Sequence, residues 1–200
     1  EENFNGYFGT TSGSDTRDAN MRRYGLSSGT SGYRWEEFDN RFDYAKEPNE
    51  ANRMGWIVEI EPFDATSVPK KRTALGRIKH ENAAQTLAAD NRVVVYMGDD
   101  QANDYVYKFV STGKYDAGNA AANRNLLEAG TLYVAKFGSG AAVGDMMGTG
   151  EWIALVPATA TTDVSTLGAK FGDIGGILVN TRLAGDAVGA TKMDRPEWVT

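Results

Sequence analysis

Cysteine is absent from the sequence and histidine occurs once, and each shortage excludes a class of site. Without thiols, these 200 residues can form neither a disulfide scaffold, nor a thiolate zinc site, nor a catalytic cysteine. His80 alone cannot supply a multi-histidine metal site. No apolar run approaches the roughly 20 residues needed to cross a bilayer, so we expect no membrane span.

Basic residues are also in short supply. The chain has 21 Lys and Arg against 27 Asp and Glu, which gives a formal net charge of −6. Nucleic-acid binding requires clustered basic side chains that neutralise phosphates, so this balance argues against a nucleic-acid partner. The same balance is compatible with bound cations. The content of 41% hydrophobic and 24% charged residues is that of a folded globular chain.

Both ends of the chain carry dense, motif-like residues. The sequence begins at Glu1-Glu2-Asn3 and finishes at Arg195–Thr200, whereas chain termini are usually polar and frayed. No signal segment with a charged and an apolar part is present. We therefore expect residues 1–200 to be a fragment of one domain, without its N-terminal signal and remaining structure, and inactive in isolation.

The pattern of turns and apolar runs predicts a mainly β fold. Glycine is abundant at 23 residues while proline is limited to 5, and glycines separate short runs of β-forming residues. The expected strands are residues 55–61, 73–80, 92–97, 104–110, 131–137 and 151–156. Short antiparallel strands at this spacing indicate a sandwich, barrel or propeller, and six strands cannot close a propeller alone. We expect several blades of a partial β-propeller, with helical and loop insertions.

Helices are expected at fewer places. Residues 1–50 read mainly as loop, with a short helix near 35–42, and a second short helix is expected at 123–129. Residues 173–190 change to helical spacing of apolar side chains, with Asp173 as the N-cap. The strands 92–97 and 104–110 are expected to pair as a hairpin with a longer loop.

Acidic side chains stand at strand ends and turns, where a β scaffold presents ligands on rigid supports. Carboxylate oxygens suit hard cations such as Ca²⁺, which takes about 6–8 oxygen ligands from separate loops. The candidate metal ligands are Glu81, Glu197, Asp99, Asp100, Glu1 and Glu2.

Structural interpretations compete with these assignments. An acidic pair such as Asp99-Asp100 commonly forms a solvated turn, and a single acid such as Glu81 commonly lies at the surface. Arg195-Pro196-Glu197 could be a turn with an exposed ion pair. His80 fits a hydrogen-bonded structural histidine, and the aromatic stripe at 105, 107 and 109 fits a core.

Four segments, taken in order, resemble the PhoX family of alkaline phosphatases. They are Asn52–Asp64 (NRMGWIVEIEPFD), Arg72–Glu81 (RTALGRIKHE), Val94–Asp100 (VVYMGDD) and Asn180–Trp198 (NTRLAGDAVGATKMDRPEW). The runs at 105–111, 130–137 and 151–156 match the same family between those motifs. The opening EENFNGY resembles the family segment that follows a metal-binding cysteine. The resemblance therefore spans nearly the whole chain.

The resemblance implies an exported β-propeller enzyme, periplasmic or extracellular and monomeric when complete, that hydrolyses small phosphate monoesters with Ca²⁺ and Fe³⁺. It implies that Glu81 and Glu197 bind metal, together with one carboxylate of Glu1/Glu2 and one of Asp99/Asp100. Arg195 is the candidate catalytic residue, as a contact to a phosphate oxygen; the alternative is that it orients the adjacent glutamate.

Two other functions fit the same residues. A non-catalytic calcium-binding propeller module would use carboxylates at loop ends equally well. Another propeller hydrolase, such as a lactonase, would also need metal-binding acids. Turnover of a chromogenic phosphate monoester by the complete protein separates the three possibilities.

Overall fold

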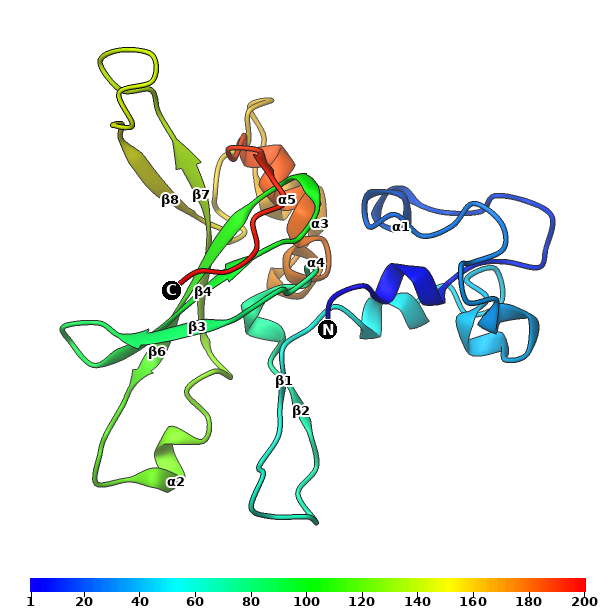
Figure 1. Cartoon of the computed structure of the whole chain (residues 1–200), viewed down its shortest axis with the longest axis horizontal. Helices are drawn as coiled ribbons and strands as arrows, with labels where there is room; N and C mark the ends of the chain where they lie inside the picture. The colour runs from blue at the N-terminus through cyan, green and yellow to red at the C-terminus, as the bar shows by residue number, and fades with distance from the viewer.

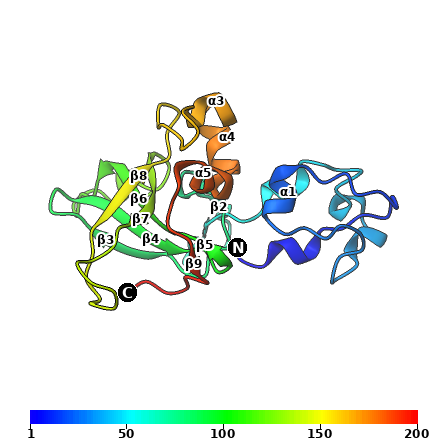
Figure 2. The same cartoon turned by 90° about the horizontal axis from the view of Figure 1, so that it is seen from above.

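The computed structural model describes residues 1–200 as two lobes (Figure 1). Residues 3–54, the N-terminal lobe, consist of turns and short helices, whereas residues 55–200, the β lobe, are built on an antiparallel sheet. The view from above shows the same separation, with the N-terminus between the two lobes (Figure 2). The first residues of the chain are therefore placed where the lobes meet.

A five-stranded antiparallel sheet with the order β3-β4-β6-β7-β8 forms the centre of the β lobe. Two further pairs, β1 with β2 and β5 with β9, lie outside this sheet. The strands are β1 (Val58–Glu59), β2 (Lys70–Lys71), β3 (Ala84–Leu87), β4 (Arg92–Gly98), β5 (Ala102–Asp104), β6 (Val106–Lys114), β7 (Gly130–Phe137), β8 (Gly150–Ala154) and β9 (Met193–Asp194).

The helices are all short. The α-helices are α1 (Ala19–Arg23), α2 (Ala120–Asn123), α3 (Leu167–Phe171), α4 (Ile174–Val179) and α5 (Thr181–Val188). The 3₁₀ helices are η1 (Phe4–Tyr7), η2 (Trp35–Glu37), η3 (Asn40–Phe42), η4 (Glu50–Arg53) and η5 (Thr73–Leu75). Four of these five 3₁₀ helices belong to the N-terminal lobe, which has no strand of its own.

Alternating side chains of the central strands make the core of the β lobe. Tyr107 and Phe109 of β6 are fully buried and lie in one cluster with Val95 of β4 and Val134 of β7. Buried residues of α3, α4 and α5 close the same cluster, among them Ile177. Because burying one large apolar side chain contributes about 1.5–3 kcal/mol, this face holds the helices on the sheet. The prediction that residues 105, 107 and 109 belong to a core is confirmed.

The strands predicted from apolar alternation are largely confirmed. The runs at 92–97, 104–110, 131–137 and 151–156 form β4, β6, β7 and β8 within a few residues of the expected ends. The hairpin of β4 and β6 is also confirmed, with Val95 opposite Phe109. The loop between them contains β5, which pairs with β9 near the end of the chain.

Of the two strands predicted before residue 81, the first is shorter than expected and the second is wrong. Of 55–61 only Val58–Glu59 forms a strand, and the carboxylate of Glu1 takes the N–H groups of Gly55 and Trp56, at 3.0 Å each. Residues 73–80 begin with η5 and then turn at Gly76, whose φ of +82° is a conformation that favours glycine. Of this segment only His80 pairs, with Asp99.

The predicted helices lie near the expected positions, but their bounds or types differ from the prediction. Residues 173–190 form α4 and α5, separated at Asn180, and the Asp173 side chain accepts the N–H of Gly176 at 2.9 Å as the predicted N-cap. The expected helix at 35–42 is two 3₁₀ turns. The helix expected at 123–129 is instead Ala120–Asn123, because the side chain of Asn119 caps it earlier.

The fold is thus mainly β, as predicted. The sheets are antiparallel and open, with edge strands β3 and β8, so the structure contains no closed propeller. No helix in the chain is both long and apolar enough to cross a membrane.

Candidate metal centre

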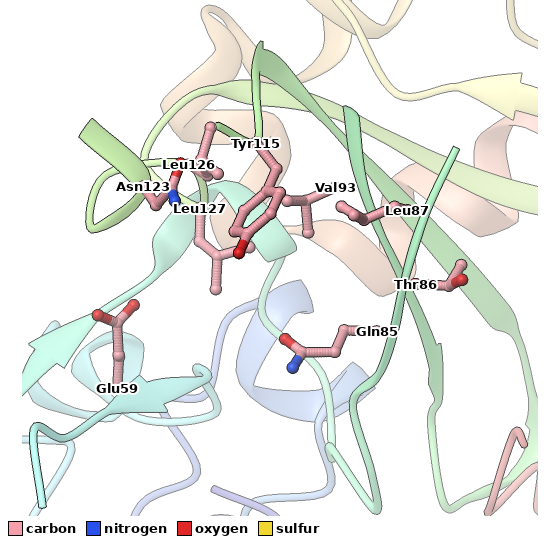
Figure 3. A pocket seen from close by; sticks show the side chains of 9 residues that line it. All are labelled: Glu59, Gln85, Thr86, Leu87, Val93, Tyr115, Asn123, Leu126 and Leu127. Carbon is pink, nitrogen blue, oxygen red and sulfur yellow. The ribbon is translucent and has the colours of Figure 1, made fainter. Parts of the chain in front are cut away.

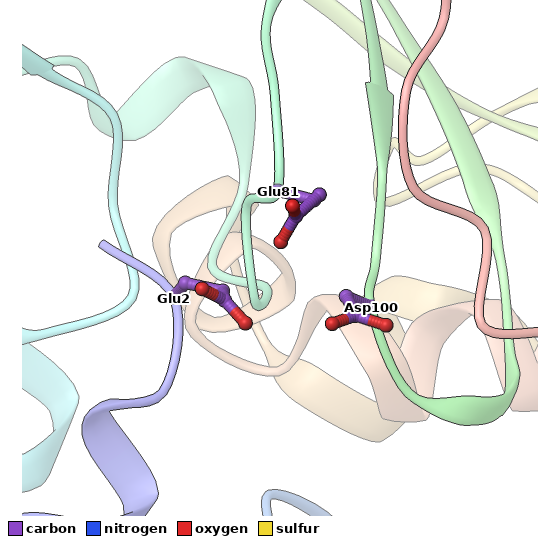
Figure 4. Close-up of side chains that lie close together, drawn as sticks. All are labelled: Glu2, Glu81 and Asp100. Atoms are coloured by element: carbon purple, nitrogen blue, oxygen red, sulfur yellow. The ribbon is translucent and has the colours of Figure 1, made fainter.

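Three carboxylates from separate parts of the sequence meet beside the junction of the lobes (Figure 4). Glu2 precedes η1, Glu81 follows the short pairing at His80, and Asp100 follows β4. One oxygen atom from each side chain lies within 4.8 Å of the others. Asp100 is buried and the two glutamates are half-buried. Such a group of oxygen donors can hold a metal ion.

Backbone hydrogen bonds join the three segments that carry these carboxylates. The N–H of Asp100 donates to the carbonyl of Lys79 at 3.1 Å, and the N–H of His80 donates to the carbonyl of Glu1 at 3.3 Å. His80 also pairs with Asp99 in an antiparallel bridge. The three carboxylates therefore project from segments whose backbones are hydrogen-bonded to one another.

The electrostatics of the cluster differ from one carboxylate to the next. Burial, and then the neighbouring charge of Glu81, raise the pKa of Glu2 above its usual value. Hydrogen bonds from Arg195 lower the pKa of Asp100. The cluster thus combines one carboxylate that is short of positive charge with one that already has a cationic partner.

That partner lies near the end of the chain. The guanidinium of Arg195 donates from Nε and Nη2 to the two oxygens of Asp100, at 2.8 Å each. The Arg195 side chain is 59% exposed, and its backbone has a φ of +54°. Glu197 lies outside the group of three, with its Oε1 3.9 Å from Nη2 of Arg195 and half of its side chain exposed.

Within each acidic pair the structure distinguishes the two members. Glu2 and Asp100 join the cluster, whereas Glu1 and Asp99 have other partners. Besides two backbone N–H groups, Glu1 accepts a hydrogen bond from Lys71 Nζ at 3.0 Å. Asp99 is fully buried, accepts from Nε of Arg182 at 2.7 Å and takes the N–H of Lys79 at 3.1 Å. Glu1 and Asp99 are therefore committed to local structure, and ligation by any of the six acids stays a prediction.

His80 is a structural histidine, as its apolar surroundings predicted. Its Nε2 lies 3.0 Å from the carbonyl oxygen of Gly76, and the ring is buried. Burial lowers its pKa to about 3, so the imidazole is neutral. The other ring nitrogen, Nδ1, has no hydrogen-bond partner.

Sequence reasoning missed two buried cations next to the cluster. Lys79 is buried, donates from Nζ to Gln101 Oε1 at 2.7 Å, and has a pKa lowered by burial. Arg182 is 1% exposed and pairs with Asp99. No local pattern could reveal this pair, because its members are separated by 83 residues.

A partly apolar hollow lies elsewhere, between β1, β3 and α2 (Figure 3). Its volume is about 470 Å³, and it is lined by Glu59, Gln85, Thr86, Leu87, Val93, Tyr115, Asn123, Leu126 and Leu127. None of the candidate ligands and no other member of the carboxylate cluster contributes to this wall. The chemistry inferred from the acids therefore does not involve this cavity.

Comparison with known proteins places the chain in a family of phosphatases. The family model described as alkaline phosphatase PhoX matches residues 1–200. The chain belongs to the PhoX family of alkaline phosphatases, which confirms the resemblance described above. No curated protein matches the chain.

A solved structure resembles the chain closely. It is described as Pseudomonas fluorescens PhoX in complex with vanadate, a transition state analogue, and it is 48% identical with a TM-score of 0.89. The match covers 99% of this chain and 34% of the other. The chain thus spans about a third of the length of that protein.

Proposed function

We propose that this chain is part of an alkaline phosphatase that hydrolyses small phosphate monoesters with the help of metal ions. Membership of the PhoX family and the similarity to a protein solved with a transition state analogue support this activity. The observation that carries the proposal for this chain is the meeting of Glu2, Glu81 and Asp100. These acids come from three segments that the sequence separates by up to 98 positions (100 − 2).

The donor set fits hard cations. All three side chains offer carboxylate oxygens. Burial and then the charge of Glu81 raise the pKa of Glu2, which indicates that this carboxylate lacks a positively charged partner. Oxygen-only ligands favour Ca²⁺ or Fe³⁺ over softer metals. We propose calcium and ferric iron as the metals, with Glu81 and Glu197 among the ligands. Metal ions would neutralise a phosphate dianion and activate an attacking oxygen.

Arg195 is the proposed contact to the substrate. Its planar guanidinium is exposed and already makes a two-point contact with a carboxylate, which is the geometry that also suits two phosphate oxygens. The remaining N–H groups of the guanidinium, on Nη1, would donate to a phosphate ester that reaches the cluster. Arg195 would then hold the ester and stabilise charge that develops on its oxygens.

Three further properties complete the proposal. The five-stranded sheet would be part of a β-propeller completed by other segments of the whole protein. That protein would be monomeric, because one propeller can gather all its loops at one end. It would act in the periplasm or outside the cell.

The proposed function is tested by removing single charges in the complete protein. Glu81→Gln and Asp100→Asn keep the side-chain shape but weaken metal ligation. We expect each to lower metal content and to slow hydrolysis of a chromogenic phosphate monoester about 100-fold, equivalent to about 2.7 kcal/mol. The control is Glu151→Gln on β8, an exposed acid outside the cluster, which should leave both readouts unchanged.

The alternatives predict different results. Full activity and full metal content in Glu81→Gln would reject the ligand assignment. A wild-type protein that binds calcium without releasing phosphate would be a binding module instead. Hydrolysis of lactones faster than of phosphate monoesters would identify the protein as a lactonase.

A further inference from the structure

The last residues of the chain run along the carboxylate cluster. We call residues 193–200 the C-terminal segment. It begins as β9, where Asp194 pairs with Ala102 of β5, and continues to Arg195, which binds Asp100. In Figure 4 this segment, drawn in the faint red of the C-terminus, passes beside the green part of the chain that bears Asp100. Its path therefore decides where Arg195 and Glu197 lie.

Asn82 holds this segment by two hydrogen bonds from one side chain. Its Nδ2 donates to the carbonyl oxygen of Val199 at 3.0 Å, and its Oδ1 accepts the N–H of Val199 at 3.4 Å. Asn82 is the residue after Glu81, and Val199 is two residues after Glu197. One carboxamide thus joins the two segments that carry these glutamates.

Gly98 allows the segment to approach closely. A methyl group at this position would collide with the carbonyl oxygens of Pro196 and Glu197. The φ of Gly98 is not positive, so the backbone conformation alone would accept another residue. Glycine is needed here because the C-terminal segment lies directly on the end of β4.

We propose that Asn82 is a positioning residue for the phosphatase site, which holds Glu197 and Arg195 beside Glu81 and Asp100. The inference rests on the proposed function, since it concerns the same site. It goes beyond that function by assigning a role to a neutral side chain that binds neither metal nor phosphate. Residues that orient metal ligands typically contribute a factor of about 10–100 in metal affinity or activity.

A second asparagine, Asn123, makes the same two-point contact with the backbone and provides a matched control. Asn123 donates from Nδ2 to the carbonyl of Asp116 at 2.7 Å and accepts the N–H of Asp116 at 3.0 Å. This second two-point contact fixes the turn around α2, and neither residue belongs to the carboxylate cluster. Asn123→Ala therefore removes the same chemistry at a place where we assign no role in the site.

The experiment compares Asn82→Ala with Asn123→Ala in the complete protein. Gly98→Ala should also displace the C-terminal segment, because the added methyl group would collide with Pro196 and Glu197. Gly32→Ala is the control for this variant, because a methyl group at position 32 meets no neighbour. Three readouts are needed: the thermal midpoint, the hydrogen exchange of the Val199 amide, and the rate of calcium release to a chelator. The exchange readout does not require bound metal, so it tests the contact separately from the proposed function.

We expect Asn82→Ala to speed both Val199 exchange and calcium release about tenfold, at a thermal midpoint equal to that of Asn123→Ala. Asn123→Ala should leave both rates at the wild-type value, and Gly98→Ala should behave like Asn82→Ala. Unchanged Val199 exchange in Asn82→Ala would overturn the inference, as would faster exchange with unchanged calcium release. If the wild type binds no metal, the proposed function fails, while Val199 exchange still decides whether Asn82 holds the segment.

Discussion

The two lobes satisfy their buried carboxylates in different ways. In the N-terminal lobe, Glu36 is 1% exposed and accepts the N–H and hydroxyl of Ser31 at 2.7 and 2.6 Å. In the β lobe, buried Asp99 and Asp104 bind arginines instead. The N-terminal lobe has no paired strands, so its carboxylates accept hydrogen bonds from backbone N–H groups that would otherwise bind carbonyls of a neighbouring strand. In the β lobe most backbone groups pair between strands, and its buried acids bind arginines, although Asp99 also takes the N–H of Lys79.

The sizes of the two cores agree with this difference. The β lobe has a cluster of 14 buried apolar residues, whereas the N-terminal lobe has 7. With about half as many buried apolar residues, the smaller lobe depends more on polar contacts and on the lobe beside it. The junction between them is therefore the place where we expect the largest effect of a mutation.

Arg77 lies at that junction, which Arg23 of the N-terminal lobe also spans through ion pairs with Asp104 and Asp186. Arg77 is fully buried, and its guanidinium lies 4.8 Å from the ring centroid of Phe4 and 4.0 Å from that of Tyr24. Its nitrogens donate to the carbonyls of Ala51 and Met54, at 2.8 Å each, and to Asn20 Oδ1 at 2.9 Å. No carboxylate contacts it, and burial lowers its pKa.

The largest predicted effect is that of Arg77→Met. Methionine keeps much of the volume but leaves two backbone carbonyls and Asn20 without their donor. We expect the free energy of unfolding to fall by about 3–5 kcal/mol, because buried acceptors lose charged hydrogen-bond partners and the cation–π contacts disappear. Denaturant unfolding of the complete protein measures this change.

The control for that substitution is Arg53→Met at the surface of the N-terminal lobe. The Arg53 side chain is 71% exposed and bonds only to Glu50, so its loss should cost less than about 0.5 kcal/mol. If both variants lose the same stability, Arg77 is not what joins the lobes.

A smaller effect is expected for Asp43→Asn, which tests the carboxylates of the N-terminal lobe. Burial alone would raise the pKa of Asp43, but hydrogen bonds from Thr11 and Ala45 lower it to about 2. The carboxylate therefore stabilises the fold above the unfolded pKa of about 3.9, and this contribution is lost as the pH falls through about 2. We expect a loss of about 2 kcal/mol at pH 7 that shrinks towards pH 2.

Amide hydrogen exchange of the N-terminal lobe against pH is the appropriate measurement, because it reports that lobe separately. Glu47→Gln, an exposed acid of the same lobe, provides the reference. A loss in Asp43→Asn that stays constant from pH 7 to pH 2 would show that shape rather than charge matters at this position.

The smallest effect is expected where a buried hydroxyl has no partner. Tyr44 in the N-terminal lobe and Tyr107 in the β lobe each bury such a group. Removing an unsatisfied hydroxyl also removes its desolvation cost, so Tyr44→Phe and Tyr107→Phe should change stability by no more than about 1 kcal/mol, towards greater stability. Thermal midpoints are sufficient to detect this.

Tyr105→Phe provides the opposite case. The Tyr105 hydroxyl donates to Asp186 Oδ1 at 2.5 Å, so its loss should destabilise the β lobe by about 1–2 kcal/mol. Equal effects of Tyr105→Phe and Tyr107→Phe would contradict the assignment of partners.

The predictions from sequence succeeded where local periodicity and burial coincide. The alternation in 92–97 and 104–110 gave the correct hairpin because each strand buries one face on the same core. Alternation in 73–80 was misleading, since Gly76 turns the backbone and Thr181 Oγ1, 104 residues away, accepts the N–H of Arg77. Partners that distant leave no local trace.

The sequence by itself determined the family, the mainly β composition and the set of acids that can bind hard cations, because motifs and strand periodicity are local properties. Only the tertiary structure decided that Glu2 and Asp100 meet Glu81 while Glu1 and Asp99 bind other partners. Adjacent residues on an extended backbone point in opposite directions, so the placement of the whole segment determines which of two neighbouring carboxylates reaches the site.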